Sequence, residues 1–596
     1  MASVLDRFSP ATREWFTGAF PEPTLAQLGA WEAISGGANA LVVAPTGSGK
    51  TLSAFLWSID RLIGEPVPDD PRHRTRVLYI SPLKALGVDV ERNLRSPLVG
   101  VTQTAKRLGL AAPTVTVGVR SGDTTTQDRR MLARVPPDIL ITTPESLYLM
   151  LTSAARETLA GVETVIVDEI HAVAATKRGA HLAVSLERLD DLLENPAQRI
   201  GLSATVRPRE EVARFLGGRT PVTIVAPPTG KRFDLQVVVP VDDMTELGTA
   251  PVLEGSSESA PAQGSIWPHV EERIVDLILQ HRSTIVFANS RRLAERLTGR
   301  LNEIYDERLA MLDEEPVELV DVTAAGASSV RFRQAQSTEA AQSPAIQSPE
   351  PFPAQAVGQS GIVGGSAGLL ARAHHGSVSK DQRAIIEDDL KTGRLRCVVA
   401  TSSLELGIDM GEVDLVVQVE SPPSVASGLQ RVGRAGHQVG EISRGVLFPK
   451  HRADLLHTAV VTERMMSGEI EALAIPKNPL DILAQQTVAA VALGPVNIDD
   501  WYDTVRRSAP FATLPRSAYY ATLDLLSGLY PSDEFAELRP RIIWDRVTGE
   551  LTGRPGAQRL AVTSGGTIPD RGLFGVFMVG STAASGSTTG GRVGEL

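Results

Sequence analysis

The sequence predicts an α/β protein in which two parallel-sheet domains follow one another and precede a mostly helical domain. Two series of short apolar runs alternate with helical patterns, the first within 1–225 and the second within 226–465. Strands that are apolar on both faces belong to sheets covered by helices on both sides, and such sheets are usually parallel. Three short helical patterns then indicate a separate domain over 466–560, and we expect 561–596 to begin a further, incomplete one.

The polar residues that follow these runs are the first candidates for a functional site, because ligands of open parallel sheets lie beyond the carboxyl ends of the strands. The first series comprises 41–43, 77–80, 115–119, 139–142, 165–167 and 200–203, and the second comprises 283–288, 396–401, 415–419 and 445–448. A loop-rich linker over 217–264, with one strand at 235–239, separates the two series. A disordered insertion over about 305–368 interrupts the second, since its composition buries too little apolar surface to fold.

Composition places the chain among ordinary globular proteins. Hydrophobic residues make up 42% and charged residues 22% of its 596 positions. With no charged-then-apolar leader and no apolar run of about 18 residues, we expect a cytoplasmic protein without a membrane segment. The single cysteine, Cys397, excludes a disulfide framework and a multi-cysteine metal site, so no structural metal is expected. The net charge of −11 argues against a uniformly basic surface but leaves nucleic acid open, because binding depends on where Lys and Arg lie.

Residues 39–51, Asn-Ala-Leu-Val-Val-Ala-Pro-Thr-Gly-Ser-Gly-Lys-Thr, indicate a strand, a glycine-rich loop and the start of a helix. In this arrangement the N–H groups of the loop and the helix N-terminus surround a polyphosphate. We expect Lys50 to reach the β- and γ-phosphates and the Thr51 hydroxyl to bind Mg²⁺. The usual pattern begins with Gly where this chain has Ala44, and a chance glycine turn is the alternative.

Two adjacent carboxylates follow the run 165–167, and they suit the chemistry of a phosphate loop. Asp168 is expected to hold Mg²⁺ through water, and Glu169 to orient and deprotonate the attacking water. A solvated acidic turn is the alternative, although the residues up to the acids are apolar. His171 has no second His or Cys at metal-ligand spacing, so we do not expect it to bind a metal. Upstream, the Gln27 amide carries a donor and acceptors, which suits an adenine edge.

The second series contains a pair of arginines that complements the phosphate loop. Gln-Arg-Val-Gly-Arg-Ala-Gly-His at 430–437 places Arg431 and Arg434 three residues apart on one helix face. An arginine held against a γ-phosphate stabilises charge in the transition state, and Arg434 is the candidate for that role. A basic solvated helix end is the alternative; the flanking glycines, which let another backbone approach closely, argue against it.

Taken in order, these motifs resemble those of the superfamily 2 DExH-box helicases. The set comprises Gln27, Ala-Pro-Thr-Gly-Ser-Gly-Lys-Thr, Ser-Pro-Leu-Lys-Ala-Leu, Thr-Thr-Pro-Glu-Ser, Asp-Glu-Ile-His, Ser-Ala-Thr, Thr-Ser-Ser-Leu-Glu-Leu-Gly-Ile-Asp and Gln-Arg-Val-Gly-Arg-Ala-Gly-His. His-His-Gly-Ser-Val-Ser at 374–379 and Ile-Pro-Lys-Asn-Pro-Leu-Asp-Ile-Leu-Ala-Gln-Gln at 475–486 are similar to the bacterial Lhr (large helicase-related) branch. The resemblance covers essentially the whole chain.

The resemblance implies two RecA-like domains with ATP and Mg²⁺ between them, followed by a winged-helix domain. Single-stranded DNA, or a strand of a DNA/RNA hybrid, would run across both domains, with 3′-to-5′ translocation, unwinding and a role in DNA repair. By position it assigns ATP hydrolysis to Lys50, Asp168, Glu169 and Arg434, nucleotide binding also to Gln27, Thr46, Gly47, Ser48, Gly49, Thr51, Gly407, Asp409 and Arg431, and magnesium to Thr51 and Asp168. It assigns coupling to His171, Ser203, Thr205 and Gln430, and nucleic-acid contacts to Ser81, Lys84, Thr143, Asn289, Ser290, Arg291, Ser377 and Thr401.

The third domain fits the winged-helix expectation by its own pattern. Its helical patterns lie at 480–493, 499–507 and 517–526, and its candidate wing strands at 542–544 and 559–562. Four arginines there are candidates for phosphate contacts or else are solvated, namely Arg506, Arg507, Arg516 and Arg541.

Two departures from the family pattern leave alternatives open. His437 stands where many relatives have Arg, which puts a second arginine finger in doubt, and the chain ends at Leu596, whereas Lhr proteins usually continue. We therefore expect a C-terminally shortened Lhr chain. An ATP-gated nucleic-acid clamp or RNA-remodelling switch that does not travel is one alternative, and a P-loop kinase, which shares only the phosphate loop, is another. The residues alone do not distinguish DNA from RNA.

Overall fold

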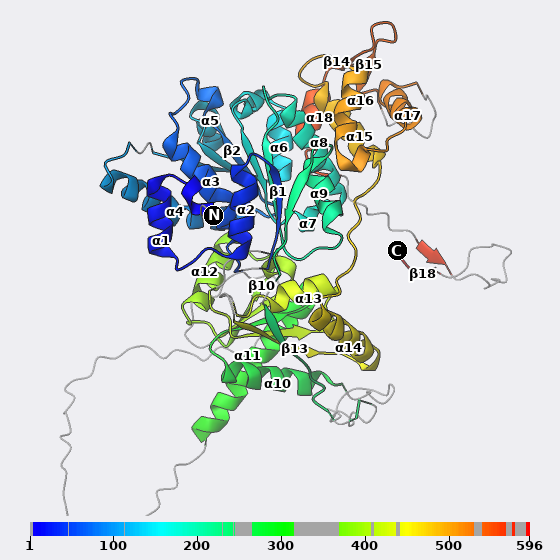
Figure 1. Cartoon of the computed structure of the whole chain (residues 1–596). Coiled ribbons are helices and arrows are strands. Elements are labelled where there is room, and N and C mark those ends of the chain that lie inside the picture. Colours follow the sequence, from blue (N-terminus) through cyan, green and yellow to red (C-terminus); the bar gives the residue numbers. More distant parts are fainter. Residues whose placement is uncertain are drawn as a thin grey trace, which may run out of the picture.

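Two parallel sheets and a small antiparallel sheet organise the chain into three domains (Figure 1). The computed structural model describes residues 4–45, 47–111, 114–228, 231–241, 243–244, 265–314, 369–406, 411–436, 441–529, 539–567, 575–577 and 592–595. In Figure 1 the first domain lies above the second, and the third packs beside the first, next to α8 (Lys177–Asp190). Among these residues, no helix combines the length and the apolar character that crossing a membrane requires.

The first sheet has its strands in the order β3-β4-β2-β5-β6-β1-β7, all parallel, as the apolar runs predict. The strands are β1 (Asn39–Val43), β2 (Val77–Ile80), β3 (Val117–Arg120), β4 (Ile139–Thr142), β5 (Thr164–Val167), β6 (Gln198–Ser203) and β7 (Val222–Val225). β7 falls inside the expected linker, where it pairs with β1 at the sheet edge. Because β1 and β5 flank β6, the residues after these three strands meet at one place.

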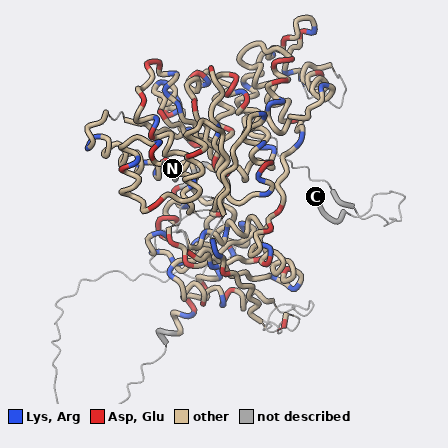
Figure 2. Tube along the Cα trace, viewed as in Figure 1, with Lys and Arg blue, Asp and Glu red and all other residues tan. Residues whose placement is uncertain are grey.

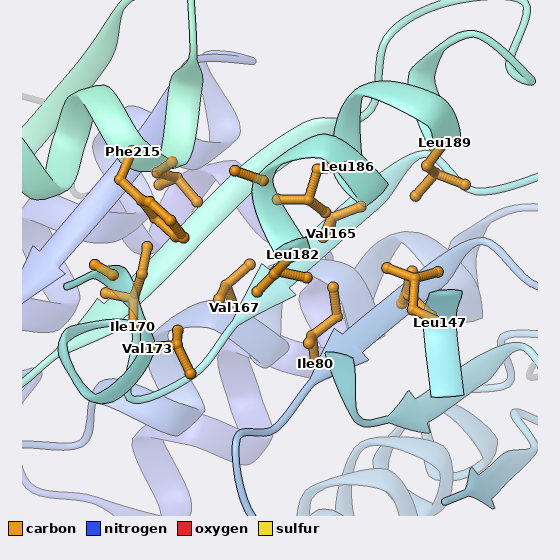
Figure 3. Close-up of a cluster of buried hydrophobic side chains, with 14 of the residues drawn as sticks. Ile80, Leu147, Val165, Val167, Ile170, Val173, Leu182, Leu186, Leu189 and Phe215 are labelled. Atoms are coloured by element: carbon orange, nitrogen blue, oxygen red, sulfur yellow. The ribbon is translucent and has the colours of Figure 1, made fainter. Parts of the chain in front are cut away.

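Helices cover both faces of this sheet. They are α1 (Pro10–Ala19), α2 (Leu25–Ser35), α3 (Lys50–Gly64), α4 (Lys84–Arg107), α5 (Thr126–Arg134), α6 (Pro144–Leu151), α7 (His171–Ala174), α8 and α9 (Arg209–Gly217). Figure 3 shows Leu182 and Leu186 of α8 lying over Val165 of β5, within a large buried cluster of the domain. Another large cluster includes Phe55 of α3 and Tyr79 of β2, on the other face. This two-sided burial explains why the strands are apolar throughout.

The second sheet is also parallel, in the order β10-β11-β9-β12-β13-β8. Its strands are β8 (Arg232–Val237), β9 (Thr284–Phe287), β10 (Ala371–His374), β11 (Cys397–Ala400), β12 (Leu415–Val419) and β13 (Ile442–Phe448). β8, expected as a strand of the linker, instead pairs with β13 and forms one edge of the sheet. β10 is absent from the expected runs because Arg372 and His374 interrupt its apolar character, and both side chains bond to α12 (Lys380–Lys391).

Five helices accompany the second sheet in the part of the chain that the structure describes. They are α10 (Trp267–Gln280), α11 (Arg291–Glu314), α12, α13 (Val425–Val432) and α14 (Arg452–Ser467). α11 continues past 305, where the insertion was expected to begin, because Arg308 pairs with Asp276 at 2.7 Å and Tyr305 packs on the core. The remainder of the expected insertion, 315–368, lies outside the described residues. Cys397 is buried in β11, and this burial raises the pKa of its thiol.

The third domain contains α15 (Leu480–Ala490), α16 (Ile498–Arg507) and α17 (Arg516–Ser527) against an antiparallel sheet of β14 (Val496–Asn497), β16 (Glu550–Gly553) and β15 (Ile542–Trp544). The predicted helices are confirmed. The second wing strand predicted at 559–562 is wrong, because α18 (Ala557–Thr563) occupies that segment. The partner of β15 is β16 instead, and Asp545 closes the loop between them by accepting the Val547 N–H at 2.8 Å. A further pair, β17 (Gly575–Phe577) and β18 (Arg592–Glu595), follows.

The third domain is attached to the first along α8. Gln486 of α15 is fully buried and donates to the His181 carbonyl at 3.0 Å, and Arg507 of α16 pairs with Glu187 at 3.2 Å. Arg507 is therefore engaged by protein carboxylates, which removes it from the candidates for phosphate contact. Figure 2 shows Lys and Arg interspersed with Asp and Glu along all three domains, as the modest net charge predicts.

Candidate nucleotide and nucleic-acid site between the two parallel-sheet domains

The loop after β1 and the start of α3 form a glycine turn in the first domain. Gly47 and Gly49 have φ values of +81° and +77°, in the left-handed region that residues with a Cβ rarely adopt. Lys50 opens α3, and its buried ammonium donates to the Ala44 carbonyl at 2.5 Å. Lys50 thus joins the end of the turn to its beginning. The predicted succession of strand, glycine turn and helix is present.

The N-terminus of α2 is attached to this turn. The Thr24 hydroxyl donates to the Ser48 carbonyl at 2.9 Å. The Gln27 side-chain oxygen accepts the Thr24 N–H at 2.9 Å, which closes a capping box. A Cβ at Gly49 would stand 2.5 Å from the Gln27 amide nitrogen, so that amide lies directly against the turn. The capping box occupies the Gln27 oxygen, and an adenine contact, which stays a prediction, would use the NH₂ group.

Asp168 and Glu169 follow β5 and lie next to the turn, each only 5% exposed. The Tyr79 hydroxyl donates to Asp168 Oδ2, and the Glu169 N–H donates to Asp168 Oδ1 at 2.8 Å. Burial, together with the adjacent Glu169 charge, raises the pKa of Asp168 to about 7. Two desolvated carboxylates attract cations, and with the Thr51 hydroxyl they offer the oxygen ligands that Mg²⁺ prefers. These residues therefore fit a magnesium ion.

A guanidinium of the second domain faces this site across the domain boundary. Arg434 follows α13, is 1% exposed, and donates to the Glu405 carbonyl at 2.9 Å. Burial lowers the pKa of the Lys50 ammonium; Glu169 and Asp168 oppose this effect, and the charge of Arg434 adds to it. One charge acts on another in this way only across a short, poorly screened distance. The fold thus brings the charge of Arg434 within electrostatic reach of Lys50, although the two are far apart in sequence.

Arg431 has a different environment from Arg434. It lies within the second domain, where its guanidinium contacts Glu405 at 3.1 Å, Asn289 at 2.8 Å and Gln418 at 3.0 Å. These contacts join three strand ends of the second sheet. A direct nucleotide contact by Arg431 stays a prediction, and in this arrangement the residue holds the domain together.

His171 connects the two domains directly. Its Nδ1 lies 3.3 Å from Ser203 Oγ and 3.5 Å from Glu169 Oε2, while its Nε2 lies 2.8 Å from the Gln430 amide nitrogen. Burial lowers the pKa of the His171 imidazole. A neutral ring can donate at one nitrogen and accept at the other, which suits a relay between the carboxylate and the second domain. The fourth predicted coupling residue, Thr205, is exposed beside this group.

A cleft of about 1180 Å³ separates the two domains next to this relay. Several of the predicted residues line it, namely Thr143, His171, Arg291, Thr401 and Gln430. Sequence reasoning missed Arg92 of α4 and Arg383 of α12, which also line it and lie outside the motifs. The cleft therefore exposes guanidinium groups from both domains, as a site for a phosphate backbone needs.

The remaining nucleic-acid candidates take part in local bonds. Ser290 accepts the Leu293 N–H at 3.2 Å, and Ser377 accepts from Arg291 at 2.9 Å. Asn289 donates to the Ser421 carbonyl at 2.7 Å, and the buried Ser81 donates to the Leu83 carbonyl at 2.8 Å. Their nucleic-acid contacts stay predictions. Thr46, Gly407, Asp409 and His437 lie outside the described residues, and so does the side chain of Lys84.

Two parallel-sheet domains, with a phosphate-type turn in one and an arginine of the other facing it, define the core of a superfamily 2 helicase. Family profiles agree with this class along the chain. One described as DEAD/DEAH box helicase matches residues 24–214, and one described as helicase conserved C-terminal domain matches 359–438. A third, described as large helicase-related protein, winged helix domain, matches 463–596.

Individual relatives point to one branch of that class. The Lhr helicase/probable uracil glycosylase of Mycolicibacterium smegmatis is 65% identical over 100% of this chain and 36% of that protein, and the Lhr helicase/uracil glycosylase of Escherichia coli is 55% identical over 99% and 36%. The solved structure of Mycobacterium smegmatis helicase Lhr bound to ssDNA and AMP-PNP has a TM-score of 0.78 and 63% identity over 98% of this chain and 65% of that one. The chain belongs to the large helicase-related (Lhr) family, as its motifs predict. It spans about a third of the length of these two curated relatives.

Proposed function

We propose that this chain is the motor of an ATP-dependent helicase that moves along single-stranded DNA. The observation that supports this most strongly is the approach of Arg434, from the second domain, to Lys50 of the first. A triphosphate bound between them would draw the domains together, and its hydrolysis would release them. ATP can drive such a cycle because it binds the closed arrangement more tightly than the open one.

Each side chain of the cleft has its own task in this proposal. Lys50 neutralises the β- and γ-phosphates, and Arg434 stabilises the charge that develops on the transferred phosphoryl group. Glu169 orients the attacking water and accepts its proton. Thr51 and Asp168 would hold Mg²⁺, which neutralises charge between the phosphates when it is bound.

Coupling to movement would pass through the contact between His171 and Gln430. A change at the Glu169 carboxylate alters what His171 can donate or accept, and Gln430 carries that change into the second domain. Guanidinium groups on both walls of the cleft, such as Arg92 and Arg383, would grip a phosphate backbone without regard to sequence. The polarity from 3′ to 5′, the unwinding of duplexes and a role in DNA repair are part of this proposal, and the family resemblance supports them.

The decisive experiment measures ATP hydrolysis with single-stranded DNA, single-stranded RNA and no nucleic acid. We expect stimulation by DNA, followed by displacement of a strand from a duplex with a 3′ tail. DNA-stimulated hydrolysis without displacement on any tailed duplex would favour the second candidate, an ATP-gated clamp. That candidate deserves testing because the chain spans only about a third of its curated relatives. Hydrolysis that survives Glu169→Gln would overturn the site itself.

A further inference from the structure

A third cation lies beside the two that define the nucleotide site. Lys231 precedes β8, in the segment that connects the two domains, and its ammonium donates to the Gly433 carbonyl at 2.8 Å. Gly433 directly precedes Arg434, so this bond places the Lys231 charge at the base of the arginine that faces Lys50. No sequence motif marks Lys231, because it lies in the loop-rich linker.

The charge of Lys231 also interacts with the two cations of the nucleotide site. Burial first, and then the charges of Arg434 and Lys50, together lower the pKa of Lys231 to about 8, while Glu441 opposes them. Like charges gathered in a poorly hydrated region repel one another, and a bound anion relieves that repulsion. An ammonium has three N–H donors, of which the Gly433 carbonyl takes one. The arrangement is that of a site for a highly charged anion.

We propose that Lys231 is a third phosphate-binding residue, which contacts the terminal phosphate of a bound nucleoside triphosphate from the connection between the two domains. The assignment to the terminal phosphate follows from which part of the chain supplies each cation. The glycine turn, which would surround the inner phosphates, belongs to the first domain together with Lys50. Lys231 instead lies in the connection between the domains, and Arg434 lies in the second domain. Lys231 would therefore distinguish a triphosphate from a diphosphate. This inference rests on the proposed function of the cleft.

The same contacts suit a second role, in which Lys231 only fixes the backbone before Arg434. The two roles differ in what they predict for nucleotide binding. A phosphate contact makes Lys231 act on the triphosphate directly, so its effect persists when Arg434 is removed. If Lys231 only supports the backbone before Arg434, its loss has no further effect on nucleotide binding once Arg434 is removed.

The test measures the affinities of the chain for AMP-PNP and for ADP, both with Mg²⁺, by titration of a fluorescent nucleotide. We expect Lys231→Met to weaken AMP-PNP binding about tenfold and ADP binding less than about twofold, as for loss of one charge-assisted hydrogen bond. Lys231→Arg should restore most of the affinity, because it restores the charge. Arg232→Met is the matched control, since Arg232 is the neighbouring exposed cation and should have no effect.

The outcomes separate the inference from the function on which it rests. The weakening by Lys231→Met should remain about tenfold in an Arg434→Ala background; its disappearance there would show that Lys231 acts only through Arg434 and would overturn the inference. Equal weakening for AMP-PNP and ADP, or no weakening, would also overturn it. A wild-type chain that binds no AMP-PNP would instead refute the proposed function.

Discussion

The first domain has two interfaces, and they are built differently. Toward the second domain it presents a cleft of about 1180 Å³ lined by polar and charged groups, bridged by the contact of His171 with Gln430. Toward the third domain it presents α8, where the buried Gln486 and the apolar residues around Val184 pack beside a smaller pocket of about 250 Å³. An interface held by buried side chains and several ion pairs is expected to stay closed, and an open polar cleft to open and close. We therefore expect the first and third domains to move as one body relative to the second.

The largest effect is expected where the polar interface performs chemistry. Glu169→Gln removes the carboxylate that accepts the proton but keeps the shape of the buried site, so kcat for ATP hydrolysis should fall about a thousandfold or more. Steady-state phosphate release measures this. The matched control is binding of AMP-PNP, which should survive, and turnover within tenfold of the wild type would contradict the role of Glu169.

The next largest effects are expected at Arg434 and Arg431 of the second domain, and they should differ in kind. Arg434→Ala should lower kcat about a hundredfold or more, because Arg434 is the arginine whose charge acts on Lys50 and which is proposed to stabilise the transferred phosphoryl group. Arg431→Ala instead leaves Glu405, Asn289 and Gln418 without their shared partner, so the free energy of unfolding should fall by about 3 kcal/mol.

Urea unfolding and ATP turnover, measured on both variants, separate these effects. A destabilised Arg434→Ala chain together with a stable but inactive Arg431→Ala chain would reverse the two assignments.

A substitution at the interface between the first and third domains should change the stability of the chain rather than its rate of ATP hydrolysis. Gln486 is fully buried and bonds to Arg188 at 2.9 Å and to the His181 carbonyl and Ser185, each at 3.0 Å. Gln486→Leu removes these three hydrogen bonds of the buried side chain, and we expect a loss of about 2 to 3 kcal/mol in the free energy of unfolding. Gln485→Leu, at the neighbouring position that bonds outward to the Ser564 carbonyl, is the control. An unchanged midpoint for Gln486→Leu would mean that the third domain is only loosely attached.

The smallest effect is a pH dependence at the same interface. Burial, assisted by the Arg188 charge, lowers the pKa of His181 to about 4, from an ordinary value of 6.5. The unfolded chain therefore binds a proton between pH 6.5 and 4 that the folded chain does not, so stability is full above pH 6.5 and declines as the pH falls. At pH 5 we expect a loss of about 2 kcal/mol relative to pH 7.

Urea unfolding at the two pH values measures this loss, and His181→Gln, which cannot take up the proton, should reduce it. The same slope in both chains would assign the titration to other groups.

Much of the fold could be predicted from local patterns, because a two-sided apolar run has few structures other than a buried strand. β2, β4 and β12 have the predicted limits for this reason. The errors come where local pattern and tertiary role separate. β10 is a strand although it carries Arg372 and His374, since bonds to α12 satisfy them. The segment 559–562 is helical although its pattern suits a strand, because the strand that pairs with β15 is β16.

The candidate site shows the same division. Its first-domain residues could be found from sequence because the glycine turn and the two acids each follow a strand directly. Tyr79 and Lys231 could not, since one lies within an apolar run and the other in a linker, and neither position has a local signal.

By itself the sequence determined the strands, the glycine turn and the types of side chain that follow each strand, because these depend on spacing within about ten residues. Only the tertiary structure decided that Arg434 and Lys231 approach Lys50, and that Gln486 is buried against α8. Those contacts join segments separated by hundreds of residues. Their free energy comes from packing and charge in the folded chain, and no local preference encodes it.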